Sequence, residues 1–233
     1  MDTSKPLRTL EVRRLGVVPY ADALTLQRAL VEQRKAGTVA DLLLLLHHPP
    51  VITLGVRGDG GRSHVLATSQ RLAELGITVQ EAGRGGDVTY HGPGQIVGYP
   101  ILDLDPDRRD VHRYVRDLEE VMIQVCAEYG VVAGRLAGLT GVWADGEKIG
   151  AIGVRISRWI TSHGFAFNVA TDLDHFRLIV PCGIGDRGVT SLERIVGRHI
   201  PIEDVEDVLI RRFADVFTRV LQAPAPSATR SLR

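Results

Sequence analysis

The feature that most constrains the fold is a two-residue turn between two segments suited to strands. Asp145-Gly146 separates GVWA from EKIGAIGVRI, and Asp-Gly in such a setting predicts a β-hairpin. A two-residue turn pairs Ala144 with Glu147 and Trp143 with Lys148. Because side chains alternate along a strand, one face is expected to carry Lys148, Gly150, Ile152 and Val154. A lysine on such a face either points to solvent from a strand end or lines a slot.

The rest of the chain alternates between segments suited to strands and segments suited to helices. Apolar or alternating runs predict strands at residues 9–15, 42–46, 51–54, 77–80, 95–102 and 159–169. The run at 42–46 is all leucine and is expected to be buried on both faces. Helical periodicity and end signals predict helices at residues 21–35, 69–75, 110–129, 192–196 and 202–221. These elements indicate an α+β or mixed α/β fold, with a mixed, largely antiparallel sheet and packed helices.

The two longest expected helices carry apolar stripes that mark their buried faces. The stripe of the helix at 110–129 consists of Val111, Leu118, Val121, Met122 and Val125. The stripe of the helix at 202–221 consists of Val205, Leu209, Phe213, Val216, Phe217 and Val220. Both helices are therefore expected to pack against the core.

Composition excludes several broad classes of protein. The chain has 28 basic and 28 acidic side chains, so a general nucleic-acid or membrane-surface binder is not expected. The longest aliphatic run is far shorter than the ~20 residues of a membrane span, and the first residues lack the apolar stretch of a signal peptide. We expect a cytoplasmic protein with a single catalytic domain over residues 1–222 and a flexible tail over 223–233.

A glycine-rich segment over residues 83–95 is the first candidate for a binding loop. It carries five glycines and a proline, which let the backbone approach a ligand closely. It matches neither a Walker A loop nor a dinucleotide-binding fingerprint. Its donor side chains are Arg84, Thr89, Tyr90 and His91. A structural turn cluster and a ligand loop both stay open, and the histidines of the chain follow no metal-ligand spacing.

The chain has two cysteines, which are too few for a disulfide framework, and it has no C-x-x-C motif. Cys126 lies near the apolar stripe of an expected helix and is interpreted as a packed, inert thiol. Cys182 lies between a proline and a glycine, where the backbone cannot be regular. It is either a nucleophile or a buried structural thiol. Under ~10% of a free thiol is ionised at neutral pH, so a nucleophile needs a base or cation; the candidates are the histidines and Lys148, one of three lysines.

Three segments together resemble one family, the lipoyl(octanoyl) transferases, or octanoyl-[acyl-carrier-protein]–protein N-octanoyltransferases. The segments are RGGDVTYHGPGQ at 84–95, LTGVWADGEKIGAIGVRISRWITSHGFAFNV at 139–169 and IVPCGIGDRGVTSL at 179–192. Their order and spacing extend over more than a hundred residues, which makes the set far more specific than any one motif. Phe167, where leucine is expected, is a conservative difference.

The resemblance implies a fold like the catalytic domain of biotin protein ligases and lipoate ligases. It also implies a role in lipoate biosynthesis through two acyl transfers. An octanoyl group passes from the phosphopantetheine thiol of an acyl carrier protein to an enzyme cysteine. The group then passes to the ε-amine of a lysine on a lipoyl domain or on the glycine-cleavage H protein. Exchange between thioesters needs no ATP, so no ATP, metal or other cofactor is expected.

The same resemblance assigns residues. Cys182 matches the acyl-thioester nucleophile, and Lys148 matches its activating partner, acting as a cation or as a base. The segments expected to line the acyl substrate are Arg84, Gly85, Gly86, Asp87, Val88, Thr89, Tyr90 and His91, then Ala151, Ile152 and Gly153, then Gly164, Phe165 and Ala166. A basic patch for the acidic carrier protein is sought among Arg57, Arg62, Arg155 and Arg158.

Two other functions remain as alternatives. An ATP-dependent lipoate or biotin-type ligase of the same fold would activate a free acid as an acyl-adenylate and would need no cysteine. A non-catalytic module that binds acyl carriers or lipoyl domains would not need both Lys148 and Cys182. The Arg-Gly-Gly loop fits the ligase and the transferase alike, and Cys182 favours the transferase.

Overall fold

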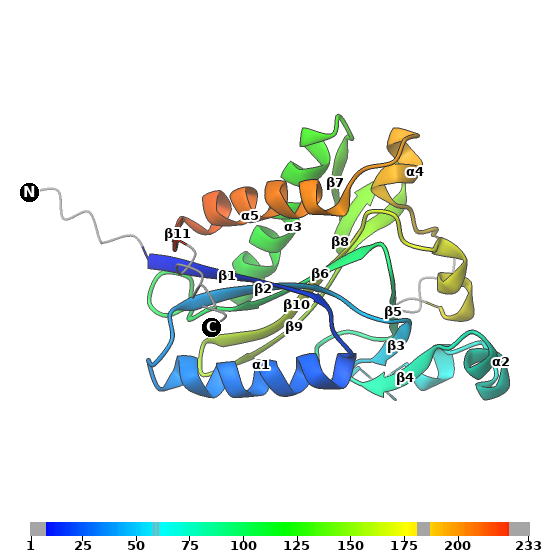
Figure 1. Ribbon diagram of the computed structural model, residues 1–233, viewed down its shortest axis with the longest axis horizontal. Helices are drawn as coiled ribbons and strands as arrows, with labels where there is room; N and C mark the ends of the chain where they lie inside the picture. Colours follow the sequence, from blue (N-terminus) through cyan, green and yellow to red (C-terminus); the bar gives the residue numbers. More distant parts are fainter. Residues whose placement is uncertain (1–7, 58, 60, 181–186, 224–233) are drawn as a thin grey trace, which may run out of the picture.

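The computed structural model describes residues 8–57, 59, 61–180 and 187–223, and this part of the chain contains two sheets. The larger is an eight-stranded sheet (Figure 1) with the order β11 (Arg219–Leu221), β1 (Arg8–Val17), β2 (Asp41–His47), β6 (Gln95–Ile101), β10 (Ile160–Asn168), β9 (Glu147–Ser157), β8 (Leu139–Ala144) and β7 (Ala133–Leu136). The pairs that β1 forms with β11 and β2 are parallel, and the other pairs are antiparallel. The predicted mixed, largely antiparallel sheet is confirmed.

Helices cover both faces of this sheet (Figure 1). Helix α1 (Tyr20–Lys35) lies on one face, and α3 (Val111–Glu128) and α5 (Ile202–Phe217) lie on the other. Strand β2 shows how the two layers share the sheet. Leu42, Leu44 and Leu46 pack in the cluster that includes α1, while Leu43 and Leu45 pack in the cluster that includes α3 and α5. The leucine run is buried on both faces, as its sequence predicts.

The smaller sheet has the order β4 (Thr78–Glu81), β3 (Val51–Leu54) and β5 (Thr89–His91). Short helices flank it: η1 (Arg62–His64), α2 (Ser69–Glu74) and η2 (Leu173–Leu178). Strand β5 was not predicted, because the glycines around it hide a three-residue strand. It pairs with β3 through Val51 opposite His91, and so fixes the end of the glycine-rich segment to the fold.

The hairpin has the predicted register. Ala144 pairs with Glu147 and Trp143 with Lys148. Asp145 and Gly146 have φ angles of 49° and 80°, the left-handed values that a type I′ turn requires. A register shift follows at Val142, and β9 then continues well past β8 to pair with β10 over its whole second half.

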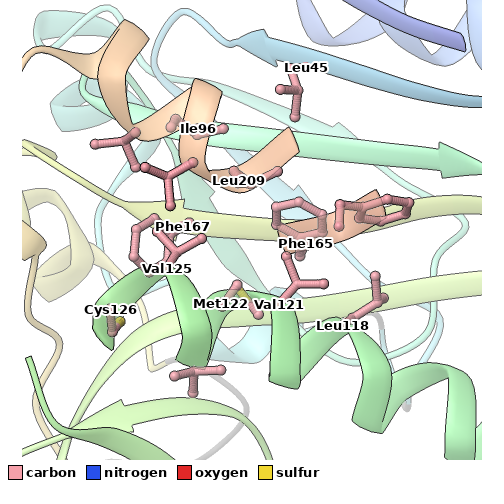
Figure 2. Close-up of a cluster of buried hydrophobic side chains, with 14 of the residues drawn as sticks. Leu45, Ile96, Leu118, Val121, Met122, Val125, Cys126, Phe165, Phe167 and Leu209 are labelled. Atoms are coloured by element: carbon pink, nitrogen blue, oxygen red, sulfur yellow. The ribbon is translucent and has the colours of Figure 1, made fainter. Parts of the chain in front are cut away.

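The face of α3 that packs on β10 and β9 forms the largest part of the core (Figure 2). Leu118, Val121, Met122, Val125 and Cys126 are fully buried there, beside residues such as Phe165 and Phe167. Burial raises the pKa of the Cys126 thiol to about 12, so the predicted inert, packed cysteine is confirmed. The assignment of Val111 to this stripe is wrong: it begins the helix and is 44% exposed.

The helix predicted over 202–221 is too long. Helix α5 ends at Phe217, and Thr218 takes the left-handed conformation with a φ of 53°. The chain then enters β11, where Val220, assigned to the apolar stripe, is 44% exposed. A purely helical reading misses this change because apolar residues at 216, 217 and 220 suit both periods.

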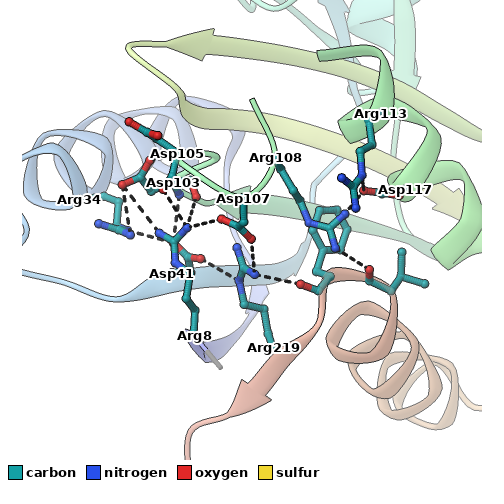
Figure 3. Close-up of polar contacts among 12 residues, drawn as sticks. Arg8, Arg34, Asp41, Asp103, Asp105, Asp107, Arg108, Arg113, Asp117 and Arg219 are labelled. Carbon is teal, nitrogen blue, oxygen red and sulfur yellow. Dashed lines mark hydrogen bonds and ion pairs between the residues drawn. The ribbon is translucent and has the colours of Figure 1, made fainter. Parts of the chain in front are cut away.

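A buried ion cluster accounts for the turn into β11 (Figure 3). The Arg219 guanidinium donates from Nε to Asp41 Oδ2 at 2.9 Å and from Nη1 to Asp107 Oδ2 at 3.1 Å. Asp41 Oδ1 also accepts a hydrogen bond from Arg34 Nε at 3.0 Å and lies 3.6 Å from Arg8 Nη2. The side chains of Arg219 and Asp41 are 2% and 1% exposed, so each charge depends on its partners.

No helix in the described ranges is long and apolar enough to cross a membrane.

We expect Arg219→Met to lower the free energy of unfolding by about 3 kcal/mol, because it leaves two carboxylates short of a buried partner. Urea unfolding at pH 7 measures the change. The exposed pair of Arg71 with Glu74 gives a control, since Arg71→Met should change stability by less than about 1 kcal/mol. An equal effect of the two substitutions would contradict this account.

Candidate functional site

A cavity of about 480 Å³ lies where the glycine-rich segment meets β9 and β10. Thirteen of the fourteen residues expected to line the substrate do line this cavity: Arg84, Gly85, Gly86, Asp87, Val88, Thr89, His91, Ala151, Ile152, Gly153, Gly164, Phe165 and Ala166. Lys148 lines it as well. The fold thus brings three sequence segments to one hollow.

The exception is Tyr90, which is not among the residues that line the cavity. Its ring packs in the small core under the second sheet, 5.4 Å from the ring of Phe176. Its hydroxyl lies 2.8 Å from Nδ1 of His175. Alternation along β5 explains this, because Thr89 and His91 point to the opposite face from Tyr90.

The glycine-rich loop is held against the free edge of β9. Gly85 donates its backbone N–H to the carbonyl of Val154 at 3.0 Å, beyond the point where β8 ends. Gly153 permits this contact: a Cβ there would lie 2.8 Å from Cδ of Arg84 and 3.0 Å from the carbonyl of Gly85. Because Gly153 has no side chain, the loop can pack directly on the strand.

Arg84 places a positive charge at the buried side of the cavity. Its side chain donates from Nη2 to the carbonyl and the hydroxyl of Thr53, at 3.0 and 2.9 Å. It also donates from Nη1 to the carbonyl of Gly85 at 3.1 Å. These bonds to β3 and to its own loop fix the guanidinium. Arg84 as a whole residue is 8% exposed.

Three buried histidines in this region are neutral at physiological pH, and His91 and His163 also feel the Arg84 charge. Burial lowers the pKa of His91 to about 3 and the pKa values of His48 and His163 to about 4. His91 bonds through Nδ1 to Oε1 of Gln95 at 2.7 Å, and its Nε2 lies 3.3 Å from the Thr53 hydroxyl. His91 therefore serves as a fixed neutral donor and acceptor rather than as a cation.

Lys148 lies at the other end of the lining, beside the hairpin turn. Its Nζ is 4.8 Å from the centroid of the Trp143 ring, within range for a cation–π contact. The Arg187 guanidinium carbon is 5.9 Å from the same centroid. The sequence left open whether Lys148 points to solvent or lines a slot. The structure shows that Lys148 lines the cavity.

Cys182 lies outside the described residues, so its predicted role stays a prediction. The chain that follows it is described from Arg187 and runs beside Lys148. Lys148 donates its N–H to the carbonyl of Gly188 at 3.0 Å and accepts from the N–H of Thr190 at 3.0 Å. A parallel bridge joins Lys148 to Val189.

Several lining residues were not singled out from the sequence. Tyr20 and Tyr99 come from α1 and β6, and Gln95 and Asn168 come from two neighbouring strands. Gln95 closes the glycine-rich motif, a signal that could have marked it; the others stand in ordinary amphipathic context. The described residues hold no group of three or more metal-ligating side chains.

The family model of the lipoyl protein ligase A/B catalytic domain matches residues 19–214. An octanoyltransferase of Myxococcus xanthus is 50% identical over 97% of this chain, and an octanoyltransferase of Rubrobacter xylanophilus is 52% identical over 93%. The chain belongs to the octanoyltransferase family. It spans 65% of the Myxococcus relative's length and 97% of the Rubrobacter relative's. As a member of this family it is an acyltransferase, and the resemblance seen in its three motifs is confirmed.

Solved structures confirm the expected fold. A bi-partite lipoate protein ligase of Thermoplasma acidophilum superposes with a TM-score of 0.70, covering 95% of this chain and 88% of that one, at 17% identity. A biotin protein ligase of Aquifex aeolicus superposes with a TM-score of 0.55, covering 89% and 70% at 15% identity. This chain thus shares the ligase fold.

The neutral histidines make the octanoyltransferase fold sensitive to acid. His91 has a folded-state pKa of about 3, while the unfolded chain binds the proton near pH ~6.5. The stability that this group contributes is therefore complete above ~6.5 and is lost progressively as pH falls toward 3. From pH 7 to pH 5 the expected loss from this one group is about 2 kcal/mol.

His91→Gln should remove that part of the decline, which urea unfolding at pH 7 and pH 5 measures. The exposed His112→Gln is the matched control and should decline with the wild type. Equal slopes in wild type and His91→Gln would show that His91 is not buried as a neutral group.

Proposed function

We propose that the chain transfers an octanoyl group from octanoyl-acyl carrier protein, through a thioester at Cys182, to the ε-amine of a lysine on lipoyl domains or the glycine-cleavage H protein. The observation that carries the proposal is the cavity lined by the glycine-rich segment, β9 and β10, with Lys148 and Val189 in its lining. The names of relatives at about 50% identity support octanoyl transfer. The Thermoplasma ligase was described with its E2 lipoyl domain, which supports the acceptor class.

In the first step the Cys182 thiolate attacks the octanoyl thioester carbonyl. A bond forms between the cysteine sulfur and the acyl carbon, and the bond to the phosphopantetheine sulfur breaks. The leaving thiolate takes up the proton that the cysteine lost. One thioester replaces another, so no ATP or metal is required, and neither is proposed as a cofactor.

In the second step the acceptor lysine amine attacks the Cys182 thioester. A C–N bond forms, the C–S bond breaks, and the cysteine leaves as a thiolate. The attacking amine must lose a proton, and Lys148 is the proposed base. The product amide is more stable than the thioester, so this step runs downhill.

The lining of the cavity suits a medium acyl chain. Apolar side chains contribute to it, among them Val97, Ile152 and Phe165, and glycines leave room beside them. Burial of six methylenes at ~0.8 kcal/mol each contributes about 5 kcal/mol, enough to favour octanoyl over acetyl.

The surroundings of Lys148 suit a thiolate nearby. Lys148 and Arg187 bring two cationic side chains to the Trp143 ring. Positive charge beside a thiol lowers its pKa and raises the ionised fraction. The chain from Arg187 to Thr190 runs along Lys148 only a few residues after Cys182, which supports the pairing of the two.

The alternatives have weaker support. The ligase structures are only 13 to 18% identical, whereas the octanoyltransferases are 49 to 52% identical. A binding module without catalysis would not need both Lys148 and Cys182.

Intact-mass measurement after incubation with octanoyl-acyl carrier protein and no ATP tests the acyl-enzyme. We expect one octanoyl group, removed by hydroxylamine and absent in Cys182→Ser. Cys126→Ser is the matched control and should acquire the group normally, because Cys126 is buried in the core. No adduct on the wild-type protein would reject the transferase mechanism.

Lys148→Arg separates a base from a fixed cation. Arginine keeps the positive charge but cannot act as a base at neutral pH. We expect octanoyl transfer to an acceptor domain to fall by at least about 100-fold, in line with the loss of general-base catalysis, measured by single-turnover assay. Near-normal transfer would remove Lys148 as the base.

A further inference from the structure

Asn168 is a buried amide with no role yet in the reaction described above. It is the last residue of β10, is 5% exposed, and lies opposite Gln95 of β6. It also contributes to the cavity lining, at the point where β10 leaves the sheet. A buried carboxamide is costly unless its polar atoms are bonded, so its partners matter.

Every polar atom of the Asn168 side chain has a partner. Its Oδ1 accepts from Nε2 of Gln95 at 2.9 Å and from the hydroxyl of Thr171 at 3.3 Å. Its Nδ2 donates to the carbonyl of Thr190 at 3.0 Å. The orientation of Gln95 is set in turn, because its Oε1 accepts from His91. The amide groups therefore have one consistent arrangement.

The bond to Thr190 leads directly to Lys148. The N–H of Thr190 donates to the carbonyl of Lys148, and the N–H of Lys148 donates to the carbonyl of Gly188. Both backbone groups of Lys148 are thus bonded to the segment 188–190. Among the described residues, Asn168 is the side chain that ties this segment to β10. Close by, the backbone N–H of Glu193 donates to the carbonyl of Val169.

Lys148 depends on this connection because it lies at a weak place in the sheet. It is next to the hairpin turn, and the pairing of β8 with β9 shifts register just beyond it. On its other side it has the single bridge to Val189 rather than a full strand. A displacement of about 1 Å in a catalytic group can cost 100-fold in rate.

We propose that Asn168 is a positioning residue: it holds the segment 188–190 on β10 through Thr190, and because that segment binds the backbone of Lys148, it places the Lys148 amine for its work on the thiol. The inference rests on the proposed function, since it requires that Lys148 act on Cys182. It adds a residue that positions Lys148 even when no substrate is bound.

The test measures the Cys182 thiol without any substrate, so that contact between Asn168 and an acyl group cannot affect it. The rate of alkylation by iodoacetamide is followed from pH 5 to pH 10. Cys182→Ser gives the blank, and the buried Cys126 does not compete. The proteins compared are the wild type, Asn168→Leu, Asn168→Asp, Lys148→Met and Thr161→Val.

Thr161→Val is the matched control. Thr161 is fully buried near the start of β10, where its hydroxyl donates to Pro100 and accepts from Leu102. Its loss weakens the same strand at the far end from Lys148. Asn168→Asp keeps the size of the side chain, but an ionised carboxylate cannot donate to Thr190.

We expect Asn168→Leu and Asn168→Asp to shift the alkylation profile toward Lys148→Met, with the rate at pH 7 reduced about tenfold, the change for one pKa unit. Thr161→Val should follow the wild type. In steady-state transfer the two Asn168 variants should lower kcat and leave KM for octanoyl-acyl carrier protein unchanged.

Wild-type profiles in both Asn168 variants would overturn the inference, and so would an equal shift in Thr161→Val. If wild type and Lys148→Met share one profile with a midpoint near the ~8.5 of a free thiol, Lys148 does not act on the thiol and the inference fails with that pairing. Failure of the proposed function is a separate result: no octanoyl adduct forms on the wild-type protein.

Discussion

The site depends on close approaches at three glycines in neighbouring strands, where a backbone carbonyl, an aromatic ring or a loop fills the space that a Cβ would need. A Cβ at Gly164 would lie 2.1 Å from the carbonyl of Gly98, and a Cβ at Gly98 would lie 2.2 Å from the Phe165 ring. At Gly153 the obstacle is the Arg84 loop. No side chain can stand at these positions without moving its surroundings. Because these positions carry no side chains, the loop packs directly on β9 and the cavity stays open above the sheet.

Local signals predicted the parts of the fold that local forces determine. The Asp145-Gly146 turn set its register because only left-handed residues close a two-residue hairpin, and five successive leucines required burial on both faces. The C-terminal strand could not be found this way. Its position depends on Arg219 reaching Asp41, 178 residues away in the sequence, and no local pattern reports such a contact.

The candidate site shows the same division. Motifs continuous in sequence, such as the loop around Arg84 and the strand after Lys148, predicted most of the lining. Tyr90 belongs to the segment 84–91 that the resemblance assigns to the substrate, but strand alternation turns its side chain away from the cavity. Asn168 lies inside the motif at 139–169, but the sequence does not mark it. Its importance comes from its bond to Thr190, a contact that only the folded chain creates.

The pairing of β1 with β11 has a consequence for how the protein is made. Arg8 lies opposite Arg219, so the first described strand finds one of its two neighbours only about 210 residues later in the sequence. On the ribosome β1 would pair with β2 early and keep an open edge until residues 219–221 have been made. Open edges recruit other strands, so this interval is when a nascent chain is most exposed to wrong partners. Truncation before residue 219 would make that interval permanent.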